Sequence, residues 1–153
     1  MRTNKYSSCQ IIVSVISIAI LICSFTQPAF YIDRQGSQDA WSNSLFLFFL
    51  GWLFLLGGGL IPFLIWLANP IYFLSLALSL KGKKIGIYLS LVSVILAIIF
   101  SLLESIITSE SGAHSKIVSL ELGYKLWLTS FLVLSFGTII CKYFNDDSNS
   151  QNL

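Results

Sequence analysis

The chain has few charged residues: Asp, Glu, Lys and Arg make up 10% of its 153 residues, where a soluble domain has about 25%. Hydrophobic residues make up 56%. A water-soluble chain of this length has too little interior to hide so much apolar surface. The net charge is only +2, and no basic stripe alternates with aromatic residues, which excludes nucleic acid as a partner. The composition is that of an integral membrane protein.

Residues that carry chemistry are also scarce. His114 is the single histidine, so a His-rich metal site and an HExxH motif are impossible. The sequence contains no GxSxG, Walker A or dinucleotide-binding motif. We therefore expect no enzyme activity, no metal and no cofactor.

The three cysteines, Cys9, Cys23 and Cys141, all fall within or beside apolar segments. None has the CxxC spacing of a metal or redox site. The pattern predicts that they act as small apolar packing residues without disulfide bonds.

Four segments are apolar enough to cross a bilayer: residues 9–26, 45–80, 85–103 and 124–143. A helix rises about 1.5 Å per residue, so a hydrocarbon core of about 30 Å needs about 20 residues. We predict an all-α integral membrane protein with a four-transmembrane-helix bundle. Residues 1–144 form its single domain, and residues 145–153 form a disordered cytoplasmic tail. The first segment is expected to stay as a span, because no small-x-small cleavage site follows it before Gln27 and Pro28.

Basic residues gather at one side of this predicted bundle. Arg2 and Lys5 precede the first segment, residues 81–84 join the second to the third with three lysines, and Lys142 ends the fourth. Cytoplasmic loops carry an excess of Lys and Arg, so both termini are expected in the cytoplasm of a multi-pass protein in the inner (plasma) membrane.

Residues 45–80 contain no charge, exceed one straight span and include helix breakers. In one arrangement, residues 45–67 span with a bend, and the chain turns at Asn69 and Pro70. In the other, residues 45–56 form a half-helix that enters from outside, and a kinked span begins at Pro62. Both place unpaired backbone groups at membrane depth, which is tolerated in a packed hinge or a wet cavity. The candidate hinge or ligand residues are Gly57, Gly58, Gly59, Pro62, Asn69 and Pro70.

The two outer loops contain residues typical of short strands, in residues 30–37 and in residues 106–108 and 117–120, the latter two spaced as a small β-hairpin. Trp41 and Trp127 are expected to anchor the outer headgroup level. Candidate residues for partner contact are Tyr31, Asp33 and Trp41. Glu104 and Lys125 end and begin adjacent spans at the outer rim, where they are candidates for an ion pair.

The chain resembles small uncharacterised four-span bacterial inner-membrane proteins. The resemblance lies in residues 27–30 (QPAF), 57–59 (GGG), 66–70 (WLANP) and 123–128 (GYKLWL), and it covers most of the chain. It implies a bacterial inner-membrane location and a Gly-rich, Trp-Leu-Ala-Asn-Pro second span, and it implies no activity.

These observations lead to two functional hypotheses. In the first, the protein acts by protein–protein interaction in the membrane, as an accessory subunit or an immunity-type protein, with another membrane protein or a second copy as partner besides the lipid bilayer. In the second, it is a small oligomeric solute or ion permease that uses the broken second span. No span interior contains Asp, Glu, His, Lys or Arg, which is unusual for a pump or ion path.

Overall fold

The computed structural model describes residues 3–33, 43–107 and 114–150, and it is mostly helical with one small sheet. The elements in chain order are α1 (Thr3–Ser24), β1 (Phe30–Ile32), α2 (Ser44–Leu50), the 3-10 helix η2 (Gly51–Leu55), α3 (Leu60–Trp66), α4 (Ala68–Leu80), α5 (Ile85–Phe100), β2 (Ser105–Ile107), β3 (His114–Leu120) and α6 (Leu122–Ser150).

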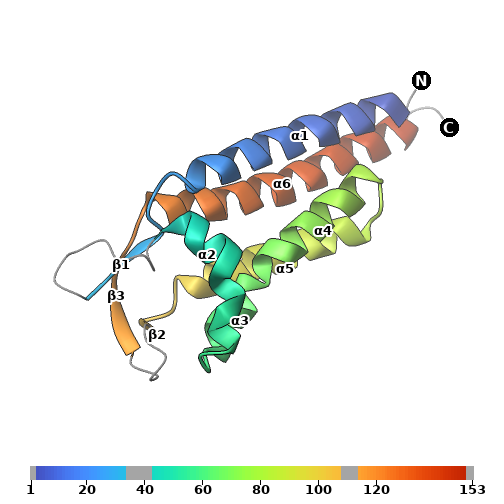
Figure 1. Cartoon of the computed structure of the whole chain (residues 1–153). Helices are drawn as coiled ribbons and strands as arrows, with labels where there is room; N and C mark the ends of the chain where they lie inside the picture. The colour runs from blue at the N-terminus through green and yellow to red at the C-terminus, as the bar shows by residue number, and fades with distance from the viewer. Residues whose placement is uncertain (1–2, 34–42, 108–113, 151–153) are drawn as a thin grey trace.

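The helices form two antiparallel pairs, α1 with α6 and α4 with α5, and α5 also packs on α6 (Figure 1). Both termini and the loop between α4 and α5 lie at one end of the molecule, called here the terminus end (Figure 1). The strands lie at the opposite end, called here the cap end. Gly137 permits the close approach of α1 and α6, because a Cβ atom there would overlap the side chain of Val13.

The long uncharged run divides at the predicted glycines. Helices α2 and η2 lead into a turn at residues 57–59, and α3 and α4 then follow almost without a break. Pro62 lies in the first turn of α3, where the missing N–H of proline costs nothing. Hydrogen bonds from Leu67 N to Phe63 O and from Ile71 N to Leu67 O carry the ladder across the junction of the two helices. Of the two predicted arrangements, the helix boundaries therefore favour the one whose span begins near Pro62.

The other arrangement is wrong, because Asn69 and Pro70 lie in the first turn of α4 and do not turn the chain. The half-helix also differs from the prediction in direction. In Figure 1, α2 and η2 run steeply across the direction of α1 and α6, and they lie over the cap end of the helix pairs instead of alongside them.

Two helical stretches among the described residues are long and apolar enough to cross a membrane, Leu60–Leu80 and Leu122–Phe144. Three other apolar helices are shorter: Ser8–Ser24, Ser44–Leu55 and Ile85–Phe100. The predicted helical architecture is thus found, and two of the four predicted spans meet the length criterion.

The sheet has the order β1-β3-β2, and both pairings are antiparallel. Phe30 pairs with Leu120 and Tyr31 with Ser119, but Ile32 pairs with Ile117 because the register shifts at Val118. Because Val118 is skipped, the pairs Phe30–Leu120 and Ile32–Ile117 both lie on the inner face, since side chains of paired residues point to the same side. The predicted strand near residue 30 and the predicted hairpin between β2 and β3 are both present.

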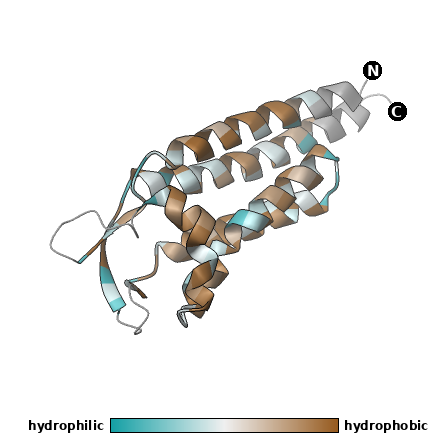
Figure 2. Cartoon of the chain, in the orientation of Figure 1, coloured by the Kyte–Doolittle hydropathy of each residue, from teal (hydrophilic) through white to brown (hydrophobic). Residues whose placement is uncertain are grey.

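Apolar side chains lie on the outside of the helices as well as in the core, unlike in a soluble protein. Large apolar side chains are exposed on the outside of the helices. Figure 2 shows mainly hydrophobic residues along the helices and hydrophilic residues at the loop between α4 and α5 and on β3. The interior contains buried hydroxyl groups on four helices, among them Ser17, Ser75, Ser90, Ser93, Ser130 and Thr138. Most of these hydroxyls donate to a carbonyl within the bundle, as Ser93 does to Ser90 O and Thr138 to Leu134 O.

Several details differ from the sequence-based predictions. Cys9 and Cys141 form a disulfide bond with their Cα atoms 5.9 Å apart, whereas no disulfide is predicted. Pairing was not evident from spacing, because 132 residues separate the two in the chain. Helix α6 continues through Ser150, so residues 145–150 are helical where a disordered tail is predicted.

Candidate functional site

A cavity of about 80 Å³ lies beneath α2 and η2, and it is partly open to the surface. Five residues of this segment line it: Ser44, Leu47, Phe48, Gly51 and Phe54. Their spacing of three or four residues places them on one helical face. Residues of the opposite face, including Leu45, Phe49 and Trp52, are exposed and also apolar. A helix that is apolar all round gives no periodic signal that tells its inward face from its outward face.

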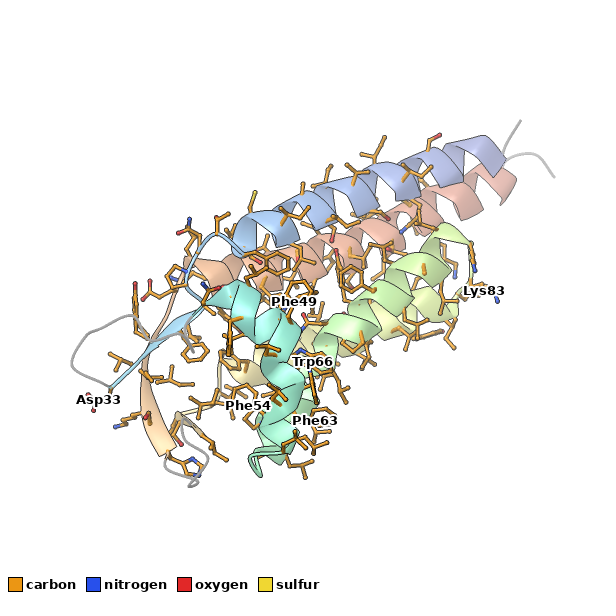
Figure 3. The ribbon with its side chains drawn as sticks, in the orientation of Figure 1. Asp33, Phe49, Phe54, Phe63, Trp66 and Lys83 are labelled. Carbon is orange, nitrogen blue, oxygen red and sulfur yellow. A yellow bond between two sulfur atoms is a disulfide. The ribbon has the colours of Figure 1, made fainter. Side chains whose placement is uncertain are left out.

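The other walls of the cavity come from α3, α4, α5, α6 and the sheet. Pro62, Ile65 and Trp66 belong to α3, and Phe100 and Ile106 close the side toward the sheet. Figure 3 shows Trp66, Phe54 and Phe63 gathered where η2 and α3 lie side by side, and the rings of Phe63 and Trp66 are stacked with centroids 6.2 Å apart. The lining is mainly aromatic and aliphatic.

Asn69 lies at this cavity with both polar atoms of its carboxamide bonded. Its Nδ2 donates to Trp66 O across 3.1 Å. That carbonyl would normally accept from residue 70, and Pro70 has no N–H, so the side chain replaces the missing backbone donor. Its Oδ1 accepts a hydrogen bond from Trp127 Nε1 at 2.8 Å.

The hydrogen bonds of Asn69 are part of a longer chain that joins four helices. Trp66 Nε1 donates to Phe48 O across 2.8 Å, so α6 is linked to α4, α4 to the end of α3, and α3 to α2. The N-terminus of α2 is fixed separately. Ser44 Oγ donates to Gln27 O, and the amide groups of Leu45 and Phe46 donate to Asn43 Oδ1. Hydrogen bonds therefore fix α2 over the cavity both at its N-terminus and at Phe48.

The structure brings only part of the predicted candidate set together. Pro62 and Asn69 line the cavity, whereas Pro70 is exposed on α4. Gly57 and Gly58 are exposed in the turn, and Gly58 has φ +80°, a left-handed conformation that favours glycine. Gly59 packs against Phe54 O, where a Cβ atom would lie 3.1 Å away. The glycines shape the turn between η2 and α3, and they do not line the cavity.

Residues that sequence reasoning missed include Trp66, Trp127 and Gly123. The ring of Trp127, which the sequence predicts as a headgroup anchor, lines the cavity, and its indole N–H donates to Asn69 Oδ1. Gly123 packs against the backbone of residues 27 and 28, where a Cβ atom would overlap Ser44. Gly123 and Trp127 both belong to the GYKLWL motif of residues 123–128. This motif marks the start of a helix, but it does not show which elements pack against that helix.

The predicted partner-contact residues belong to the cap end. Tyr31 is half-buried on β1, and Asp33 is exposed, with its backbone N–H donating to Lys116 O across 2.9 Å. Trp41 lies outside the described residues. Lys116 and Val118 on β3 are exposed as well, and Ser119 Oγ donates to a carboxylate oxygen of Glu121 across 2.6 Å. Apart from the exposed Val118, this outward face is polar and mixed in charge.

Glu104 and Lys125 are both exposed, and the contacts of these two described residues include no ion pair between them. The predicted rim pair therefore plays no part in the site. Within the described residues, no cluster of His, Cys, Asp or Glu side chains could hold a metal ion.

Comparison of the chain with protein-family models, with curated proteins and with solved structures finds no match. The functional conclusion therefore depends on the geometry of the chain itself.

Proposed function

We propose that this chain is a four-span protein of the inner (plasma) membrane that acts by protein–protein interaction through its cap end, as an accessory subunit or an immunity-type protein. The distribution of side chains supports the membrane location. Large apolar side chains surround hydroxyl groups, and hydrocarbon is the surrounding in which such a surface is stable. Helix α1 has 22 residues, enough to cross, whereas α5 has 16 and crosses by local thinning of the bilayer, at a small cost for each ångström of mismatch.

The positions of the basic residues support the orientation. The loop with Lys81, Lys83 and Lys84 lies at the terminus end together with both chain ends, while Asp33 lies at the opposite end (Figure 3). The positive-inside rule then places the termini in the cytoplasm and the cap outside.

The choice between partner binding and permease activity rests on Asn69, because its Nδ2 and Oδ1 atoms are both hydrogen-bonded within the fold. A permease that used this broken span would present the carboxamide or the freed carbonyl of Trp66 to its solute. Both groups are occupied, since Asn69 bonds Trp66 O and accepts from Trp127. The broken span acts as a packed hinge, and the polar face of the cap sheet is the surface left for recognition.

A site-specific photo-crosslinker tests the proposal in native membranes. It is placed at Val118, on the outward face of β3, and in a matched control at Lys83, in the loop of the terminus end. We expect one discrete adduct with another membrane or secreted protein from the Val118 position and none from the Lys83 position. Recovery of self-adducts alone, together with solute flux in vesicles, would overturn the proposal and favour the oligomeric permease.

A further inference from the structure

The lining of the cavity beneath α2 is mostly aromatic and aliphatic, and its indole and hydroxyl donors are already used within the protein. The indole N–H groups of Trp66 and Trp127 donate to Phe48 O and Asn69 Oδ1, and the hydroxyl of Tyr124 donates to Ala97 O. Ser44 and Ser24 likewise donate to carbonyls of residues 27 and 21. Water in a buried cavity needs two to four polar partners, and apolar cavities instead take apolar molecules.

The surroundings of the cavity indicate where such a molecule comes from. The roof of the cavity is formed by α2 and η2, and the outward face of this roof carries the exposed apolar side chains of Leu45, Phe49, Trp52 and Leu55. In the proposed membrane location these side chains contact lipid chains directly. Only α2 and η2 therefore separate the partly open cavity from the hydrocarbon of the membrane.

We infer that the cavity is a binding site for the end of a lipid acyl chain, which enters beneath α2 from the outer leaflet. The inference rests on the proposed membrane location and goes beyond it, because it assigns a specific bound lipid in place of general solvation. A cavity of about 150 Å³ binds benzene, so the volume of about 80 Å³ here admits the last few carbons of a chain. The aromatic side chains of Phe48, Phe54 and Phe100 line the cavity, where they would contact the chain.

Photoreactive phospholipids test the inference on the full-length protein in bilayers. The probe carries a diazirine at the end of one acyl chain, and the labelled residues are mapped by mass spectrometry. Ile65 and Ile106 line the cavity and are only 4% and 2% exposed, so general lipid solvation does not reach them. Phe49 and Leu56 are exposed and report contact with lipid in general.

We expect labels at all four positions in the wild type. The variant Leu47→Phe fills the cavity and should reduce labelling of Ile65 and Ile106 at least tenfold while Phe49 and Leu56 stay labelled. The matched control Leu45→Phe, on the exposed face of the same helix, should leave all four labels unchanged.

The two possible failures are distinguishable in the wild type alone, so they do not depend on the folding of any variant. Labels at Phe49 and Leu56 without labels at Ile65 and Ile106 would overturn the acyl-chain site and leave the membrane location intact. Absence of label from all four positions in bilayer preparations would contradict the membrane location itself.

Discussion

The indole N–H of Trp127 donates a hydrogen bond to Oδ1 of Asn69 across 2.8 Å, although 58 residues separate the two in the chain. The bond joins the second turn of α6 to the first turn of α4. Asn69 also donates to Trp66 O, the carbonyl that Pro70 leaves without a backbone donor. One side chain therefore replaces the missing backbone hydrogen bond between α3 and α4 and links α4 to α6.

The first prediction concerns this bond. Asn69→Leu keeps the volume of the side chain but leaves Trp127 N–H and Trp66 O without their partner, so we expect a loss of about 1–3 kcal/mol in the free energy of unfolding. Unfolding in detergent, combined with Trp127→Phe in a double-mutant cycle, measures the coupling. Trp52→Phe, at an exposed tryptophan, serves as the control. Additive effects of Asn69→Leu and Trp127→Phe would show that the two residues are not coupled.

The second prediction separates glycines that pack from glycines that do not. In Gly123→Ala the new Cβ atom would lie 2.5 Å from Pro28 O and 2.6 Å from Gln27 O, so backbone must move. We expect a loss of about 1–3 kcal/mol, as for other overpacked sites. In Gly57→Ala the nearest neighbour is Phe54 O at 3.8 Å, and we expect stability close to that of the wild type. Equal thermal stability of the two variants would contradict the close docking of α2, α6 and the segment before β1.

The third prediction uses Cys9 and Cys141, which lie at the terminus end. In the proposed orientation this end faces the reducing cytoplasm, so the two thiols are expected to be free in cells. Oxidation of isolated membranes should then form the Cys9–Cys141 disulfide and raise the free energy of unfolding by about 2–4 kcal/mol. Trapping of thiols at lysis, followed by mass spectrometry, measures the redox state, and Cys9→Ser removes the effect of oxidation. A disulfide already present at lysis would place the termini in an oxidising compartment.

The fourth prediction compares two exposed apolar residues with different proposed surroundings. Ile95 on α5 is 57% exposed and Val118 on β3 is 66% exposed. A lysine in the middle of a span costs about 2.5–3.5 kcal/mol for insertion, so Ile95→Lys should lower the yield in the membrane fraction sharply. Val118→Lys, in the cap, should have no such effect. A soluble, monodisperse Ile95→Lys variant would contradict a lipid-facing α5.

Much of the architecture could be predicted because its signals are local. The glycines and Pro62 mark the end of η2 and the start of α3, and the branched residues near 30, 106 and 117 mark the strands. Each signal depends on backbone preferences within a few residues, so one sequence suffices to recognise it.

The contacts that build the cavity could not be predicted in the same way. The run 45–55 is apolar on all sides, so its pattern does not reveal that Leu47 and Phe48 face inward while Leu45 and Phe49 face outward. The pairing of Asn69 with Trp127 depends on how α4 and α6 are placed relative to each other. In a membrane segment, where the outward side chains are as apolar as the inward ones, that placement leaves no periodic trace in the sequence.

Cysteine accessibility at the two ends of the molecule tests the central claim most directly. Asp33→Cys and Lys83→Cys are made separately in a background with Cys9, Cys23 and Cys141 replaced by serine, because Cys23 is an exposed free thiol and the other two are expected to be reduced in cells. Intact cells are then treated with a membrane-impermeant maleimide. We predict that the Asp33→Cys protein is labelled at once and that the Lys83→Cys protein is labelled only after the cells are permeabilised. Labelling of both positions in intact cells, or of Lys83→Cys alone, would contradict a membrane-spanning bundle with its cap outside and its termini in the cytoplasm.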